Sequence, residues 1–181
     1  MSTHEVKLGI GDVSGMFYHA PAGTALPASA NAPLAAAWKE VGDVSQDGIS
    51  FSKDMSTENL RNWANVIKRV FVTEHTESVQ APIISTTVES LKTVLGEDNV
   101  AESGNTITAS LSSAELPPEE AFLFRMKDDD DMIVIACKKG QVTAIEGISF
   151  APGSPITWTP TITALEEGWQ LILTTDNGAS S

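Results

Sequence analysis

Four consecutive aspartates, Asp128 to Asp131, form the densest group of chemically active side chains in the sequence. Two carboxylates about 5 Å apart repel by roughly 0.8 kcal/mol in water, so such a run is tolerable only where solvent reaches it. Three interpretations are open: a solvated turn, a cation site, or an acidic surface that acts on something nearby. An EF-hand loop alternates its ligands and ends in a distant glutamate, whereas these aspartates are contiguous and their side chains would splay apart. We therefore expect no dedicated metal site here.

The other reactive side chains do not form an enzymatic site. The histidines His4, His19 and His75 are far apart in the sequence and show no metal-ligand spacing. The single cysteine, Cys137, lies in the apolar run MIVIACKK, where a small buried side chain is the expected role. We predict no catalytic, metal or cofactor-binding residues, no cofactor and no enzymatic activity.

The charge balance bears on possible partners. The chain has 181 residues, of which 41% are hydrophobic, and a formal net charge of −13. A protein this acidic repels a phosphate backbone, which argues against nucleic-acid binding. No apolar stretch approaches the roughly 20 residues that span a bilayer, and the N-terminus lacks a basic region followed by an apolar run. We expect a soluble protein without a membrane span.

Composition changes along the chain and suggests three parts. Residues 1–37 are small, polar and punctuated by proline, which favours an extended arm, either disordered or laid against a neighbour. Residues 38–176 hold the periodic apolar segments and are expected to form a single domain. Residues 177–181 are expected to be a frayed tail.

The segment STENLRNWANVIKRVFV, residues 56–72, fits two structures. Leu60, Trp63 and Ile67 fall at helical spacing, which predicts a helix. The residues that follow are rich in Val, Ile, Thr and Phe, which favours two long strands with apolar residues on both faces. The residues alone leave both structures open.

The rest of the chain favours strands around one short helix. Thr86 and Glu89 have the spacing of a capping box, and Gly96 can close the helix, so we expect a helix at about 87–95. After it come short β-rich segments separated by turn signals at the aspartates, Lys139–Gly140, Pro152–Gly153 and Glu167–Gly168. This pattern predicts a mainly β protein, an antiparallel β-sandwich or barrel with one short helix and an extended N-terminal arm.

The stretch PAGTALPASANAPLAAAWKEVGDVSQDGISF, residues 21–51, carries a family resemblance. It resembles the opening of the major tail proteins of long-tailed (siphovirus) bacteriophages, especially those that infect actinobacteria. In that family a P-x-G-T-x-L-P arm leads to a Trp and then to G-x-V-S-x-D-G. The matching residues here are Pro21, Gly23, Thr24, Leu26, Pro27, Trp38, Gly42, Val44, Ser45, Asp47 and Gly48.

The resemblance implies a structural virion protein, a tail tube subunit with no catalysis. Six subunits would form a ring, rings would stack, and inner strands would join across subunits into a barrel around a channel for DNA ejection. It also implies strands, not a helix, at residues 56–72. The implied partners are further copies of the chain, the tape measure protein, the tail terminator and the distal tail proteins. The implied location is the phage tail, with the host cytoplasm before assembly.

The resemblance gives the single residues possible roles. The aspartates Asp128, Asp129, Asp130 and Asp131 become candidates for an acidic lumen or rim that repels DNA. The residues expected to contact neighbouring subunits are Pro21, Leu26, Pro27, Trp38, Asp47, Ile49, Phe51, Trp63, Ile67 and Phe71.

Two rival functions stay open at this point. One keeps the fold and changes the setting: a tube subunit of a contractile injection or secretion system, or a tail-completion or capsid-decorating protein. The other is a binding module or enzyme whose site the sequence does not display.

Overall fold

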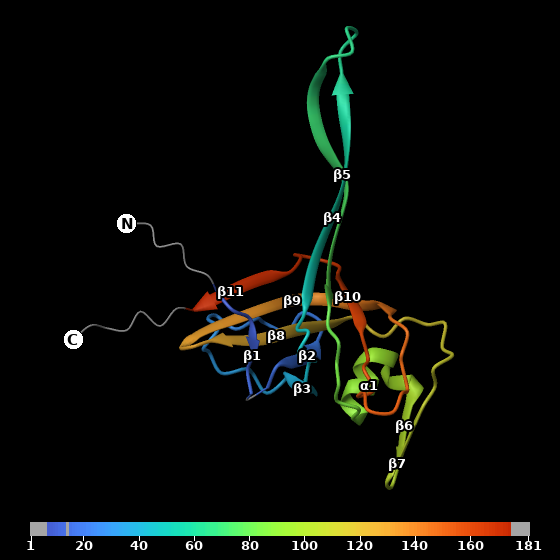
Figure 1. Ribbon diagram of the computed structural model, residues 1–181. Coiled ribbons are helices and arrows are strands. Elements are labelled where there is room, and N and C mark those ends of the chain that lie inside the picture. Colours follow the sequence, from blue (N-terminus) through green and yellow to red (C-terminus); the bar gives the residue numbers. More distant parts are fainter. Residues whose placement is uncertain (1–6, 14, 175–181) are drawn as a thin grey trace, which may run out of the picture.

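The computed structural model describes residues 7–13 and 15–174. Over these residues the fold is mainly β with one short α-helix, α1 (Val88–Leu95), followed by a 3-10 turn, η1 (Glu97–Asn99), as the sequence predicted (Figure 1). His4 and the predicted tail at 177–181 lie outside the described residues. The strands are β1 (Ile10–Gly11), β2 (Phe17–Pro21), β3 (Lys39–Gly42), β4 (Ser50–Arg61), β5 (Ile67–Gln80), β6 (Val100–Ser103), β7 (Thr106–Ala109), β8 (Glu120–Asp128), β9 (Asp131–Ile145), β10 (Pro160–Ala164) and β11 (Gln170–Thr174).

Nine strands form one antiparallel sheet, and β6 and β7 form a separate ribbon. The sheet runs in the order β3-β2-β8-β9-β10-β5-β4, with β1 added to β8 and β11 added to β9. The long strand β9 connects the two halves, because it pairs with β11 through residues 132–136 and with β10 through residues 140–145.

The continuity of β9 corrects the predicted turn at Lys139–Gly140. Gly140 is a strand residue whose surroundings leave no space for a side chain. A Cβ there would lie 3.0 Å from the Cys137 sulfur and 3.1 Å from the Phe122 ring. The glycine therefore marks a close approach inside the sandwich, not a reversal of the chain.

Alternate residues of β8 serve two apolar cores, as expected for a strand buried on both faces. Phe122 and Phe124 belong to the larger core, where Phe124 stacks on Phe17 of β2 with ring centroids 4.4 Å apart. Ala121 and Leu123 belong to the smaller core on the other face. The larger core also takes buried side chains from β5, β10 and α1, so it holds the sandwich together.

Part of the segment expected as an extended arm lies on the body of the molecule. Residues Phe17–Pro21 are β2, which pairs with β8. Ala30 and Trp38 are buried in the smaller core, and Leu26 packs against it. Residues 17–38 thus contribute one strand to the sheet and several side chains to the smaller core. The division into arm, domain and tail stays a prediction.

Helix α1 begins with a capping box that is displaced by one residue from the predicted one. Thr87 is the N-cap, its side chain accepts from the Ser90 amide, and the Ser90 hydroxyl accepts from the Thr87 amide. Glu89, the predicted partner, is instead free to turn towards the sheet. Gly96 ends the helix with a positive φ of 94°.

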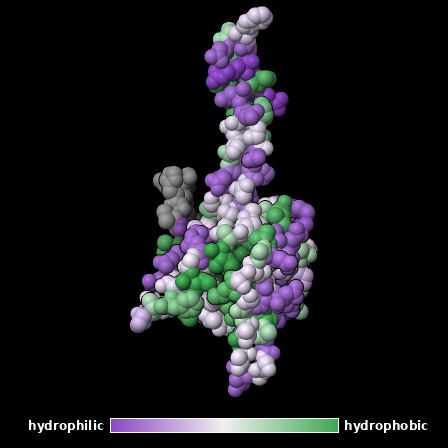
Figure 2. All heavy atoms as spheres, turned by 90° about the vertical axis from the view of Figure 1, so that its right-hand side faces the viewer, coloured by the Kyte–Doolittle hydropathy of each residue, from purple (hydrophilic) through white to green (hydrophobic). Residues whose placement is uncertain are grey.

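Residues 50–80 form strands β4 and β5, which confirms the structure implied by the family resemblance over the helix suggested by periodicity. The two strands pair from Ser50 opposite Gln80 to Arg61 opposite Ile67. Beyond the short contact of β5 with β10, the hairpin stands away from the body as a narrow arm (Figures 1 and 2). We call residues 50–80 the hairpin arm.

Candidate functional site

The hairpin arm has two faces of different chemistry. Paired residues of an antiparallel hairpin share a face, and successive pairs alternate between faces. One face, here called the apolar face, presents five apolar side chains that are between 40% and 60% exposed: Phe51, Met55, Val72, Val70 and Ile67. The polar residues between them on this face are Lys53, Thr57, Asn59, Arg61, His75 and Glu77. A two-stranded hairpin with exposed apolar residues is at best marginally stable alone. This face therefore fits a surface that a partner covers.

The other face, here called the polar face, is mostly small and hydrophilic. Its pairs from the base outwards are Ser50–Gln80, Ser52–Ser78, Asp54–Thr76, Ser56–Glu74, Glu58–Phe71 and Leu60–Arg69. The face thus carries the three carboxylates Asp54, Glu58 and Glu74, and its large apolar groups are confined to the outer end. Such a face can remain in water, unlike the apolar face opposite.

The base of the hairpin arm is fastened to the body through Glu77. This carboxylate lies 3.1 Å from Lys53 across the hairpin and accepts a 3.1 Å hydrogen bond from the Trp169 amide. The bond from Trp169 and that from Lys53 hold the pKa of Glu77 below its ordinary value, so it stays ionised. The arm is therefore anchored at its base, while farther out neither of its edges pairs with another strand of the described residues.

The tip of the hairpin arm is an ordered turn. The Asn62 amide donates to the Val66 carbonyl at 3.0 Å, and the Asn62 side-chain oxygen accepts from the Val66 amide at 2.9 Å. Asn65 takes a left-handed φ of 60°, which Asn tolerates better than most residues. Trp63 projects from this turn and is fully exposed, with a relative accessibility of 104%.

The aspartate run is the turn between β8 and β9, at the left edge of the body in Figure 1. Asp129 and Asp130 are exposed, and Asp129 has a positive φ of 51°. Asp128 accepts a hydrogen bond from the Leu8 amide at 3.1 Å, and Asp131 forms an ion pair with Lys7. Among residues 7–13 and 15–174, no group of three acidic, His or Cys side chains is arranged to hold a metal ion. The turn is solvated, and its place in an assembly stays a prediction.

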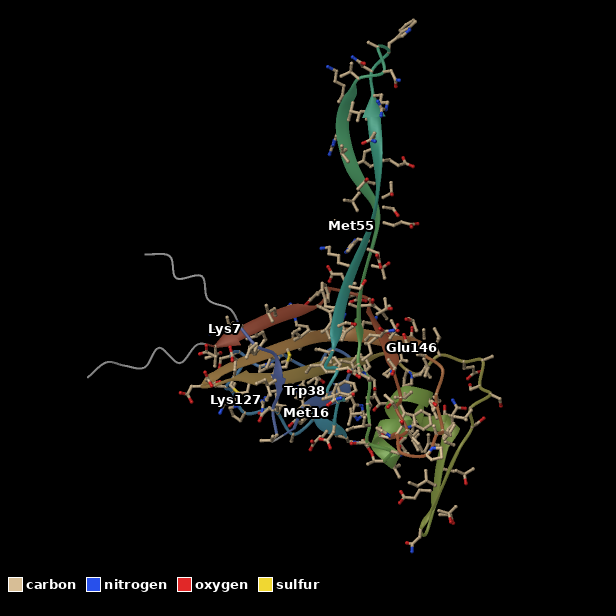
Figure 3. The ribbon with its side chains drawn as sticks, in the orientation of Figure 1. Lys7, Met16, Trp38, Met55, Lys127 and Glu146 are labelled. Carbon is tan, nitrogen blue, oxygen red and sulfur yellow. The ribbon has the colours of Figure 1, made fainter. Side chains whose placement is uncertain are left out.

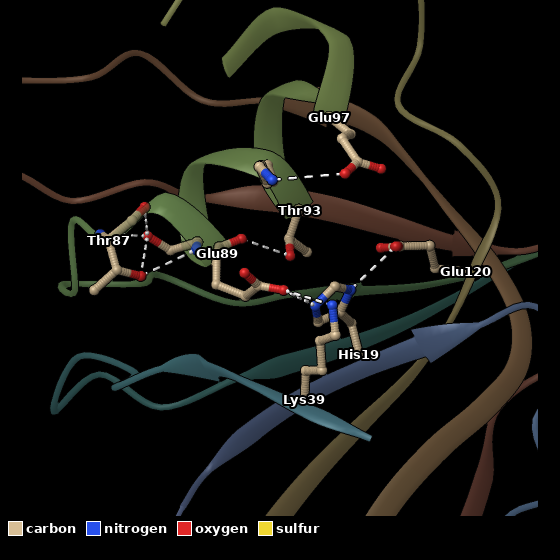
Figure 4. Close-up of polar contacts among 9 residues, drawn as sticks. His19, Lys39, Thr87, Glu89, Thr93, Glu97 and Glu120 are labelled. Atoms are coloured by element: carbon tan, nitrogen blue, oxygen red, sulfur yellow. Dashed lines mark hydrogen bonds and ion pairs between the residues drawn. The ribbon is translucent and has the colours of Figure 1, made fainter. Parts of the chain in front are cut away.

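A buried histidine joins α1 to the sheet (Figure 4). His19 of β2 is 8% exposed; its Nδ1 lies 3.1 Å from Glu120 of β8, and its Nε2 lies 3.3 Å from Glu89 of α1. Lys39 of β3 completes the cluster, 3.4 Å from Glu89. Burial alone would lower the pKa of His19, but the hydrogen bonds and charges of Glu120 and Glu89 raise it overall. With both ring nitrogens engaged, the cluster acts as a structural link.

The cysteine has no catalytic environment. Burial raises the pKa of the Cys137 thiol to about 12, so the reactive thiolate is not formed near neutral pH.

No helix in the described part of the chain has the length and apolar character needed to cross a bilayer.

The predicted subunit-contact residues fall into two groups. Phe51, Trp63, Ile67 and Phe71 are exposed on the hairpin arm, and Asp47 and Ile49 directly precede it. By contrast, Leu26 and Trp38 pack against the smaller core of their own chain, with Pro27 half-buried beside them in sequence and Pro21 exposed at the end of β2. A role of these residues in subunit contacts stays a prediction.

Comparison with known protein families identifies the fold. The family model described as "Phage tail tube protein" matches residues 10–174, which span both cores and the hairpin arm. The chain belongs to the phage tail tube protein family. It is thus a structural component of a phage tail, in agreement with the resemblance at residues 21–51. No curated protein matches the chain.

Several features of this tail tube chain were not visible in its sequence. The Asn62–Val66 turn that presents Trp63 was missed because the helical spacing of its neighbours dominated the pattern. The His19 cluster was missed because Glu89 and Glu120 are 70 and 101 residues away along the chain. The asparagines on either side of Trp63 were the available turn signal.

Proposed function

We propose that the chain is the major tail tube subunit of a long-tailed phage, and that it assembles into stacked rings of six around a channel for DNA. The observation that carries this proposal is the hairpin arm, with one exposed apolar face and one acidic, hydroxyl-rich face. Neighbouring copies would cover the apolar face, and the unpaired edges of β4 and β5 would extend the sheet between subunits. The tape measure, tail terminator and distal tail proteins are the proposed further partners.

The polar face of the arm supplies the channel surface in this proposal. A channel for DNA must be wetted and must not retain phosphates. Asp54, Glu58 and Glu74 with their Ser and Thr neighbours meet both needs, whereas the apolar face meets neither. The aspartate turn remains a second contributor to an acidic lumen or rim. Assembly would precede DNA passage, so the subunits would first be present in the host cytoplasm.

Matched substitutions on the two faces test this proposal. Val70→Asp places a charge on the apolar face, and Thr76→Asp places the same charge on the polar face; both side chains are exposed. We expect both variants to fold as monomers with native circular dichroism. Electron microscopy should show tubes for the wild type and Thr76→Asp but not for Val70→Asp. Wild-type protein that remains monomeric at high concentration would overturn the proposal.

A further inference from the structure

The outer end of the hairpin arm is chemically distinct from the rest of this acidic chain. Residues 59–73 contain the three cations Arg61, Lys68 and Arg69 and no Asp or Glu, although the chain has 11 basic and 24 acidic residues in all. The fully exposed Trp63 lies in their midst, held by the turn described above. Trp and Arg are the side chains most enriched at binding hot spots. The tip therefore has the composition of a binding knob.

A groove of complementary chemistry lies at the other end of the arm. It has a volume of about 450 Å³ and runs between β1 and the segment that leads into β4. Phe124 of the larger core forms part of its lining and is itself buried. Four other apolar residues in the lining are Ile10, Met16, Val44 and Ile49. Figure 3 places Met16 in the body, well away from the outer half of the arm.

Carboxylates lie next to two of the segments that line this groove. Asp47 is exposed and lies between lining residues Gln46 and Gly48. The aspartate turn follows directly on the β8 residues that pair with β1, with Lys127 opposite Ile10. The one cation in the lining, Arg125, already donates to the Ala32 carbonyl and lies 5.9 Å from the Tyr18 ring. The groove thus offers apolar walls, with Asp47 and the aspartate turn near them, to a basic, aromatic knob.

The knob cannot enter the groove of its own chain. The groove ends where β4 begins, the tip lies where β4 ends, and the twelve residues of this strand separate them by about 35–40 Å. If the knob enters this groove, the groove therefore belongs to a second copy of the chain. A contact between two different surfaces of identical subunits can close into a ring or continue along an open stack, and the proposed tube of stacked rings allows both.

We propose that Trp63 of one copy inserts into the groove lined by Ile10, Met16, Val44 and Ile49 of another copy. Arg61, Lys68 and Arg69 then face Asp47 and the aspartate turn of that copy. This inference rests on the proposed assembly into a tube and specifies one contact within it. The aspartate turn acquires a role at a subunit junction in this arrangement.

A disulfide trap tests the contact directly. The double variant Ala64→Cys with Gln46→Cys keeps Trp63 and places one thiol beside the knob and one at the groove, both at exposed positions. Mild oxidation of assembled protein should give a ladder of covalent multimers on a non-reducing gel. The matched control, Ala64→Cys with Glu102→Cys on β6, should give none, and the buried Cys137 should not contribute.

Removal of the knob gives an independent readout. We expect Trp63→Ala to raise the concentration needed for assembly about tenfold or more, and Trp63→Phe to raise it much less. Tubes that form without the Ala64–Gln46 cross-link would overturn this inference and leave the proposed function intact. Failure of the wild type to assemble would contradict both.

Discussion

Among single residues, His19 and Gly140 contribute to the packing of the body of the tail tube chain. His19 lies between two carboxylates from different elements, and a Cβ at Gly140 would press on Cys137 of β9 and Phe122 of β8. Neither residue lies on the hairpin arm. Their substitution should therefore change the stability of the monomer, in contrast to changes on the arm.

His19 should make stability depend on pH. Its pKa is raised in the folded protein, so the protonated form is stabilised; this contribution is present below the ordinary pKa and is lost as pH rises through the folded value. We expect His19→Gln to lower the free energy of unfolding by about 1–3 kcal/mol near pH 6 and by clearly less near pH 8.5. Urea denaturation at both pH values measures this. An equal loss at both pH values would contradict a role for the charged imidazole.

Gly140 should tolerate no side chain. The Cβ of Gly140→Ala would press on Cys137 and Phe122 inside the larger core, so we expect a loss of about 1–3 kcal/mol in the free energy of unfolding. Gly147→Ala is the matched control, since no atom of the described residues lies within 4 Å of a Cβ there. Thermal denaturation that shows similar stability for both variants would refute the close approach.

At the scale of elements, the predictable parts were those set by local sequence. The helix at 88–95 was found to within one residue, because a threonine cap, an apolar stripe and a glycine are all local signals. Periodicity could not identify the hairpin arm as two strands. Two bulges interrupt the alternation of residues between its faces, so its apolar residues fall at spacings that resemble those of a helix. The prediction of a turn at Lys139–Gly140 was wrong, because a glycine can allow close packing inside a strand as well as a reversal of the chain.

The hairpin arm should be a separable element. Its outer residues contact little besides each other, so we expect the free energy of unfolding of the body to change by less than about 0.5 kcal/mol on Val70→Asp, while assembly is lost. Urea denaturation and sedimentation velocity of the same variant measure the two effects. A large loss of monomer stability would show that the arm is part of the cooperative core.

At the scale of the whole molecule, the net charge would oppose the proposed assembly and would repel DNA in the proposed channel. A ring of six subunits, each with a net charge of −13, would carry about −78. The basic tip of the arm offsets this only locally. Self-repulsion over such a ring must be overcome whenever subunits associate.

Salt should therefore promote tube formation. The Debye length falls from about 30 Å at 0.01 M salt to about 10 Å at 0.1 M, which screens repulsion between exposed carboxylates. Light scattering of purified protein over this range should show assembly at lower protein concentration as salt rises. Assembly that weakens with salt would instead indicate that attraction between the basic tip and acidic groove dominates over the repulsion of whole subunits.

A cryo-electron microscopy reconstruction of particles formed by the purified chain would locate the hairpin arm in the assembly. We predict a hollow tube in which the hairpin arm lies between copies, with its apolar face covered and Asp54, Glu58 and Glu74 towards the channel. A tube whose channel is lined by other elements, with the hairpin arm free in solvent, would rule out the proposed role of the arm.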